Sequence, residues 1–227
     1  MLPHASPLRI LWVLLCASCL ALGGTAQAQD PPKKKPPGVF LTVQEALDLA
    51  FPKAELVRET VYLSKQELKR FSKLAGESVE QRILHPYRAY APPAKPGGKR
   101  GALLATAWFD THKVRTVRET LMVVVNADGK VARLEILAFA EPKKYLPRAK
   151  WYAQFLGKSL GPELDTKRDI RGIAGASMSC RAATHAVRRM LAGHQIAQEQ
   201  AQRAREKAAQ NKTKNKTKKK TDKDTDK

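Results

Sequence analysis

The chain has 227 residues, which is enough for one ordinary domain with terminal extensions. Its 42 Lys and Arg against 21 Asp and Glu give a formal net charge of +21, yet no RRM, KH or zinc-finger signature accompanies this charge, so a nucleic-acid partner is not indicated. The cysteines and histidines are too few and too scattered for a disulfide framework or a metal site.

Residues 1–28 have the features of an export signal. Arg9 precedes an apolar run of 13 residues, Ile10 to Leu22, which is too short to cross a bilayer core of about 30 Å. Ala26-Gln27-Ala28 supplies the small residues that precede a signal-peptidase cut. We therefore expect cleavage after Ala28 and a location in the periplasm or on the extracytoplasmic face of the membrane. An uncleaved anchor and a lipoprotein cut at Cys19 are the alternatives.

A linker rich in Pro and Lys, residues 29–38, leads into the domain, which we place at 39–193. Two Ser/Thr-x-x-Glu capping-box patterns stand before apolar-periodic runs and predict two helices in its first half. The elements expected there are a helix over 42–51, a strand over 56–63, a helix over 64–74 and a Pro- and Gly-rich loop over 87–100.

The centre of the chain has the strongest strand signals. Residues 120–125 (TLMVVV) are almost continuously apolar, as in a strand that is buried on both faces. Asn126-Ala127-Asp128-Gly129 predicts a tight turn, and the strand after it alternates charged and apolar residues. The elements expected here are strands over 103–109, 120–125 and 131–139 and helices over 145–160 and 182–191, the last with Arg188 and Arg189 on its outer face and an end near Gly193.

The remaining residues, 194–227, form a basic tail. Residues 195–210 are polar almost all round and extend the last helix, whereas 211–227 are Lys-, Thr- and Asp-rich and are expected to be disordered. The fold class that these elements predict is α+β: a single domain with a mainly antiparallel central sheet flanked by helices, followed by the disordered tail.

The segment 171–180 (RGIAGASMSC) stands before the last helix and is the candidate site. Small residues let a ligand approach the backbone closely, and the first turn of a helix presents N–H groups that have no partner within the helix. These groups and the positive end of the helix dipole favour a phosphate. The ordinary alternative is a helix start that is capped by Ser177 or Ser179.

The run from Gly172 to Ser177, followed by a helix, resembles the FMN-binding domain family. That family includes the flavin-carrying extracytoplasmic subunits of sodium-pumping NADH:quinone reductases and of Rnf electron-transport complexes. Its motif runs Asp, Gly, any residue, Ser or Thr, Gly, Ala, Thr, and the last hydroxyl carries FMN through a phosphoester bond. Gly172, Gly175 and Ala176 match, Ser177 takes the acceptor position, and Arg171 and Ala174 depart from the motif. The resemblance covers roughly residues 100–192, including the hairpin at 120–139.

The resemblance implies FMN as the cofactor and an electron carrier or redox subunit rather than a stand-alone enzyme. No catalytic residue and no metal ligand are predicted. The expected flavin-binding residues are Arg171, Gly172, Ala174, Gly175, Ala176, Ser177, Met178 and Ser179, with Trp108, Glu141 and Tyr145 from upstream. For Trp108 and Tyr145 the alternative role is a core or rim aromatic, and for Glu141 an ordinary loop carboxylate.

Two functions are therefore considered. The first is an exported FMN-binding electron-transfer protein, with the flavin attached to Ser177 by a phosphoester or held without a covalent bond. Its partners would be a flavin transferase and a membrane redox complex or periplasmic electron carrier. The second is a cofactor-free basic adaptor of the cell envelope, whose tail binds anionic lipid or an envelope polymer. The departures at Arg171 and Ala174 favour the second.

Overall fold

The computed structural model describes residues 35–95 and 97–224, with side chains described up to residue 211. The predicted signal peptide, its cleavage site after Ala28 and most of the 29–38 linker lie outside the described residues. Within the described part of the chain, no helix combines the length and the apolar character that a membrane crossing requires.

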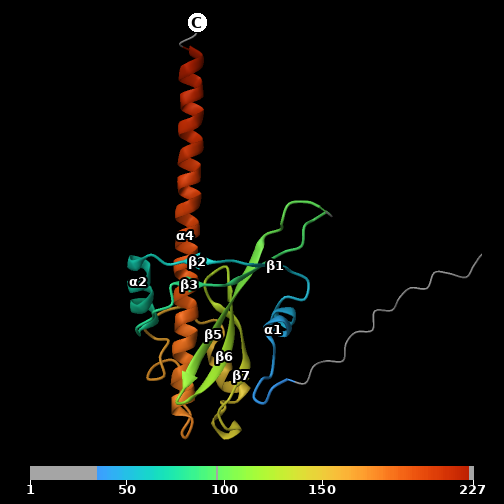
Figure 1. Cartoon of the computed structure of the whole chain (residues 1–227), viewed down its shortest axis with the longest axis vertical. Helices are drawn as coiled ribbons and strands as arrows, with labels where there is room; N and C mark the ends of the chain where they lie inside the picture. The colour runs from blue at the N-terminus through green and yellow to red at the C-terminus, as the bar shows by residue number, and fades with distance from the viewer. Residues whose placement is uncertain (1–34, 96, 225–227) are drawn as a thin grey trace, which may run out of the picture. The chain divides into compact units, whose positions relative to one another are not determined.

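The centre is a five-stranded antiparallel sheet with the strand order β1-β4-β5-β6-β7 (Figure 1). Its strands are β1 (Glu55–Arg58), β4 (Tyr87–Tyr90), β5 (Leu103–Val114), β6 (Val117–Asn126) and β7 (Val131–Phe139). Two further strands, β2 (Val61–Tyr62) and β3 (Ile83–Leu84), pair with each other in a separate small sheet. The predicted mainly antiparallel centre is confirmed, and β7 has the predicted bounds.

The helices are α1 (Val43–Ala50), α2 (Lys65–Ala75), α3 (Ala149–Tyr152) and α4 (Ser177–Asp224), with 3₁₀ turns η1 (Lys143–Tyr145) and η2 (Ala153–Phe155). Both predicted capping boxes are present. The Thr42 hydroxyl accepts the Glu45 N–H at the start of α1, and the Ser64 hydroxyl accepts the Glu67 N–H at the start of α2. Each cap satisfies a backbone N–H that has no partner inside its helix, and this fixes where the helix begins.

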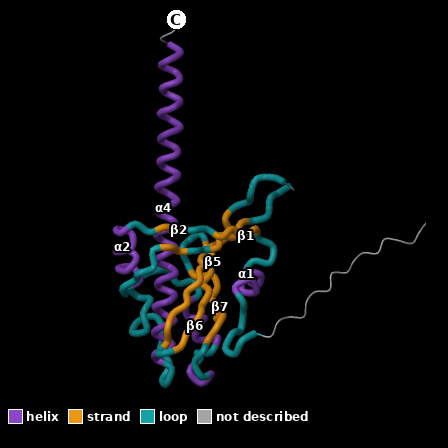
Figure 2. Tube along the Cα trace, in the orientation of Figure 1, coloured by secondary structure: helices purple, strands orange, loops and turns teal. Residues whose placement is uncertain are grey.

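Helices cover both faces of the sheet, and β6 shows why its sequence is so apolar. Leu121, Val123 and Val125 belong to the core between the sheet and α4. Met122 and Val124 alternate to the opposite face, where they pack in a second core with Leu47 of α1. Figure 2 shows α4 and α2 on one side of the sheet and α1 on the other.

Three predicted boundaries were wrong. A single strand over 56–63 is replaced by β1 and β2, because the chain leaves the large sheet after Arg58 and pairs with β3 instead. β4 lies inside the predicted loop 87–100, where the fully buried Ala89 holds it between β1 and β5. The predicted helix over 145–160 is broken into η1, α3 and η2, since Pro147 has no N–H to donate and Gly157 adopts a φ of +75°.

The course of α4 differs from prediction in two ways. Gly193 does not end the helix; a Cβ atom there would lie 3.2 Å from both Trp108 and Leu84, so the missing side chain lets α4 pack closely on the sheet. The residues from 211 to 224 are helical where disorder was predicted (Figure 1). Ala, Gln, Glu and Lys are good helix formers, and they continue α4 beyond Ala197, its last buried residue among the described side chains.

Arg188 and Arg189 lie inward rather than on the outer face as predicted. The Arg188 guanidinium donates to four carbonyl oxygens at 2.7–3.1 Å: those of Leu74 and Ala75 at the end of α2, and those of Gly161 and Leu164 in the loop before α4. Terminal helix carbonyls have no partner inside their helix. Arg188 supplies these carbonyls with a donor, and it joins α4 to the end of α2 and to the loop before α4.

Candidate functional site

The start of α4 presents three backbone N–H groups that have no hydrogen-bond partner among the described residues, those of Ser177, Met178 and Ser179. The next N–H, of Cys180, already bonds to the Ala176 carbonyl at 3.0 Å. Ala176 has no side-chain oxygen with which to cap the helix, and the first turn contains no acidic residue. The capping role that was considered for Ser177 or Ser179 is not observed in the described hydrogen bonds. This helix end therefore suits an external anion.

Backbone contacts hold the loop before α4 in place. The indole N–H of Trp151 donates to the Arg171 carbonyl at 2.5 Å, and the Arg171 N–H donates to the Gln154 side chain at 2.9 Å. Gly175 then turns the chain into the helix with a φ of +83°. Arg171 and Ala174 depart from the expected motif, but both side chains are exposed, so these departures leave the backbone geometry of the loop intact.

Gly175 and Gly172 differ in whether the backbone conformation requires a glycine. A Cβ atom would meet no atom within 4 Å at either position, but only Gly175 has a positive φ. We expect Gly175→Ala to lower the free energy of unfolding by about 1 kcal/mol through backbone strain alone. Gly172→Ala, the matched control, should change it by much less. Urea unfolding of both variants measures the difference, and equal stability of the two would contradict this account.

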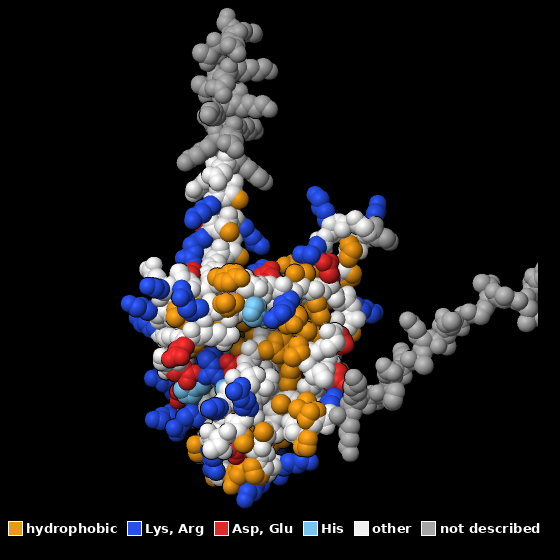
Figure 3. Space-filling model, viewed as in Figure 1, with side chains coloured by type: hydrophobic (Ala, Val, Ile, Leu, Met, Phe, Trp, Pro, Cys, Tyr) orange, Lys and Arg blue, Asp and Glu red, His pale blue; other side chains and the backbone are white. Residues whose placement is uncertain are grey.

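A hollow of about 300 Å³ lies beside the start of α4, and we call it the basic hollow. Lys113 and Arg115 at the β5–β6 turn face Met178 and Arg181 of α4 across it. None of the three cations has a carboxylate partner among the residues that the structure describes. Ser177 does not line the hollow, but its exposed side chain precedes that of Met178. In Figure 3, Lys and Arg side chains surround acidic and histidine side chains on the same face.

Arg115 connects the turn to two predicted site residues. Its Nε donates to the sulfur of Met178 at 3.3 Å, and its guanidinium carbon lies 5.1 Å from the ring centre of Tyr145. Arg115 is also the one non-glycine residue with a positive φ in the described chain, at +55°. Arg115 lies in the two-residue turn between the paired Val114 and Val117, where a positive φ is ordinary, and the turn places its cation over an aromatic ring and beside the start of α4.

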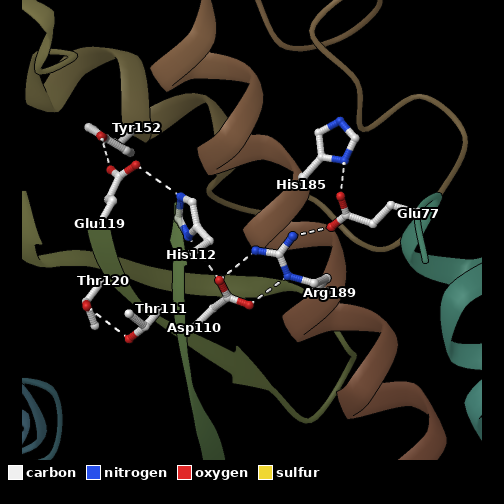
Figure 4. A network of polar contacts seen from close by, with 9 residues as sticks. All are labelled: Glu77, Asp110, Thr111, His112, Glu119, Thr120, Tyr152, His185 and Arg189. Atoms are coloured by element: carbon white, nitrogen blue, oxygen red, sulfur yellow. Dashed lines mark hydrogen bonds and ion pairs between the residues drawn. The ribbon is translucent and has the colours of Figure 1, made fainter. Parts of the chain in front are cut away.

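A buried polar network lies beneath the basic hollow (Figure 4). Its inner end is Glu119, which is 1% exposed, accepts the Tyr152 hydroxyl at 3.0 Å and lies 3.1 Å from His112 Nε2. His112 Nδ1 lies 2.9 Å from Asp110. Burial lowers the pKa of His112, but the contacts with Asp110 and Glu119 outweigh this effect and raise the pKa above 6.5. A carboxylate at each ring nitrogen favours the doubly protonated form of His112.

The outer end of the network reaches α4 and α2. Arg189 donates a hydrogen bond to each oxygen of Asp110, at 2.7 and 2.8 Å, and also forms an ion pair with Glu77. Burial raises the pKa of Asp110, but the hydrogen bonds from Arg189 and His112 outweigh this effect and hold the pKa below its usual value. His185 Nδ1 lies 3.1 Å from Glu77, an ion-pair distance at which the angle does not suit a hydrogen bond. His185, Arg189 and Glu77 all line the basic hollow.

Trp108 and Glu141 are not brought to this site. Trp108 is 4% exposed, and its indole N–H donates to His194 Nδ1 at 3.2 Å. His194 lies about 25 Å along α4 from Ser177, given 1.5 Å per residue. Trp108 is thus a core aromatic, the alternative role considered for it. Glu141 is half-buried in the loop after β7 and has no hydrogen bond or ion pair among the described residues.

The two buried histidines predict a stability maximum near pH 6.5. Burial lowers the pKa of His194 to about 4. The contribution of neutral His194 to the free energy of unfolding is therefore complete above pH 6.5 and is lost as the pH falls from 6.5 towards 4. The raised pKa of His112 gives a contribution that is present below 6.5 and is lost as the pH rises through the folded value. The His194 effect alone is about 3 kcal/mol when complete.

Urea unfolding between pH 4 and 9 measures this profile. The variant His194→Gln should remove the loss on the acid side, and His112→Asn should remove the loss on the alkaline side. A free energy of unfolding that stays flat across this range would show that neither histidine titrates differently in the folded and unfolded chains.

The candidate list derived from sequence omitted Lys113, Arg115 and Arg181. The signal for the first two was present in the basic run 113–118, which lies between the predicted strands 103–109 and 120–125. Asp110 and His112 are two residues apart on β5, and His112 pairs in register with Glu119 of β6. The period-two spacing of Asp110 and His112 places both side chains on one face of β5, and this spacing could have indicated the network.

Comparison with protein-family models gives one match, to the FMN-binding domain, over residues 118–192. The matched region begins on β6, includes β7 and ends within the packed part of α4. Comparisons with curated proteins and with solved structures give no significant match. The groups of His, Cys, Asp and Glu that a metal ion requires are not found within the described residues.

Proposed function

Because the chain carries an FMN-binding domain at residues 118–192, and this domain indicates FMN as the cofactor, we propose that the protein is an exported electron-transfer protein with its flavin attached to Ser177. The observation that supports this proposal most strongly is the start of α4. Three unpartnered N–H groups, an exposed hydroxyl and a hollow lined by unpaired cations lie together there.

The residues present fit the phosphate end of FMN. The N–H groups of residues 177–179 would donate to phosphate oxygens, and the helix dipole favours the same charge. Lys113, Arg115 and Arg181 would add charge-assisted contacts, which are stronger than neutral hydrogen bonds. Tyr145, beneath Arg115, offers an aromatic surface next to these cations.

When bound, FMN supplies one- and two-electron transfer, and the protein supplies binding, orientation and electrostatics. The buried network would set the charge beneath the basic hollow. Arg189 and His112 lie between the carboxylates of Asp110, Glu119 and Glu77 and would offset most of their negative charge. This arrangement leaves Lys113, Arg115 and Arg181 free to bind an anion.

Covalent attachment suits the compartment that we propose. Free FMN is scarce outside the cytoplasm, and occupancy by mass action would be low unless affinity were high. The donor would be a flavin dinucleotide presented by a flavin transferase. The Ser177 oxygen would form a bond to phosphorus while the pyrophosphate bond breaks, and the nucleoside monophosphate would leave with the hydroxyl proton. The other proposed partner is a membrane redox complex or a periplasmic electron carrier.

The phosphate contacts are tested by FMN affinity. We expect Arg115→Gln and Arg181→Gln each to weaken noncovalent FMN binding about tenfold, since each removes a charge-assisted contact. Arg118→Gln is the matched control, because Arg118 is exposed on β6 but does not line the basic hollow. Equilibrium dialysis of the Ser177→Ala chain avoids covalent capture during the measurement. Equal affinity in all three variants would contradict the proposed phosphate site.

The adaptor function keeps one observation in its favour. α4 continues past its last buried residue, and Arg203, Arg205 and Lys207 are exposed on this part of the helix. Such a helix suits anionic lipid or an envelope polymer. The two functions are separated by flavin content, because the adaptor alone would be isolated without FMN.

A further inference from the structure

A second hollow, of about 320 Å³, lies between α4 and the part of the sheet formed by β4 and the first half of β5. It includes His194 on α4, about 25 Å along the helix axis from Ser177. One ring nitrogen of His194 is buried there without a hydrogen-bond partner among the described residues.

His194 has a buried donor with nothing to bind. The side chain is 5% exposed, and its Nδ1 accepts the Trp108 indole N–H at 3.2 Å. A neutral imidazole has one acceptor and one donor nitrogen, so the proton lies on Nε2. Nε2 is buried and has no hydrogen-bond partner among the described residues. A buried donor that is left unpaired costs free energy, which indicates that another molecule completes this contact.

The residues around His194 favour a negatively charged ligand. Arg88 and Thr106 are paired in register on β4 and β5, and both line the hollow. The Arg88 Nε forms an ion pair with Glu59 at 2.7 Å, and the Arg88 side chain has no hydrogen bond to a described residue. Arg205 adds a second guanidinium from α4. None of the residues that line the hollow is acidic.

Apolar side chains form another part of the lining, next to Gln198 and Gln202. Leu103, Trp108 and Ala197 form walls beside the polar groups. A bare inorganic anion would leave these walls in contact with water, whereas a molecule with a compact apolar body would cover them.

We propose that this hollow is a second ligand site, separate from the flavin site, for a small organic carboxylate with a compact apolar body. One carboxylate oxygen accepts the His194 Nε2–H, and the other pairs with the Arg88 guanidinium, while the apolar body lies against Trp108 and Leu103. Arg205 lies at the same hollow and adds attraction for the negative charge.

The probe that tests this site is benzoate, added to the full chain as isolated. Benzyl alcohol has the same ring without the charge, and sulfate has the charge without the ring. The readouts are the ¹H–¹⁵N signals of the His194 ring and of the Trp108 indole, assigned with His194→Gln and Trp108→Phe. We expect benzoate to shift both signals with millimolar affinity, and benzyl alcohol and sulfate to bind about tenfold more weakly or worse.

Variants then locate the contact. Arg88→Gln and Thr106→Val should weaken benzoate binding about tenfold and severalfold, respectively. Arg205→Gln should weaken it as well, whereas Lys207→Gln, the matched control two residues further along α4, should not. Ser177→Ala should also leave it unchanged, because the flavin site is remote. Signals that do not move, sulfate binding as strong as that of benzoate, or equal binding by the Arg205 and Lys207 variants would each overturn the proposal.

Discussion

Replacement of Ser177 by Ala is expected to abolish covalent flavin attachment completely while the fold is retained. The side chain is exposed and makes no hydrogen bond to a described residue, so its hydroxyl contributes little to stability. The same exposure makes the oxygen accessible to a transferase at the start of α4. Mass spectrometry of the protein after incubation with a transferase and its flavin donor measures the adduct, and circular dichroism monitors the fold.

Two further variants make this test specific. Ser177→Thr keeps a hydroxyl at the same position and should still be modified. Ser179→Ala is the matched control, because Ser179 also lies in the first turn of α4 but is 3% exposed. It should be modified to the same extent as the unaltered chain. An adduct that persists in Ser177→Ala would place the attachment on another residue.

Replacement of Arg189 by Leu is expected to lower the free energy of unfolding by about 3 kcal/mol. Arg189 holds Asp110 through two hydrogen bonds and pairs with Glu77, and both Arg189 and Asp110 are mostly buried. Without the guanidinium, the Asp110 carboxylate would keep only His112 as a positively charged neighbour. Urea unfolding should show a lower midpoint with an unchanged m value, because the same surface is exposed on unfolding.

Arg181→Leu provides the comparison for this stability effect. Arg181 lies on the same helix and lines the same basic hollow, but it is exposed and has no partner among the described residues. Its loss should leave stability nearly unchanged and weaken FMN binding. If both variants were equally stable, the ion pairs of Arg189 would contribute no more than a surface cation does.

Features that depend on neighbouring residues were predictable from the sequence. The two capping boxes place the starts of α1 and α2 through contacts that span three residues. The turn at 126–129 and the apolar run of β6 likewise carry their own signals. The start of α4 was identified because its residues, from Gly172 to Ser177, are consecutive.

Features that depend on distant residues were not predictable in this way. Gly193 reads as a helix end, and only the proximity of Trp108 and Leu84 shows why a glycine lies within the helix. Trp108 was expected near the flavin, but its partner is His194, which lies 86 positions later in the chain. Arg189 was expected on an outer face, and its two partners come from α4's neighbours, β5 and the end of α2. Tertiary packing decides each of these placements.

The site combines a local signal with a distant one. The open helix start is encoded in one segment, whereas the cations that complete it come from the β5–β6 turn. The departures at Arg171 and Ala174 change side chains that are exposed to solvent. The backbone N–H donors of residues 177–179 are unaffected by them. The backbone donors expected at this motif are therefore present although two of its side chains differ.

The most direct test of the central claim is the flavin content of the protein isolated from its own host, measured by absorbance and by intact mass. We predict one FMN per chain, retained after denaturation, with a mass increase of one FMN less one water that maps to the peptide containing Ser177. A colourless protein that gains no mass after exposure to a flavin transferase and its dinucleotide donor would contradict the account.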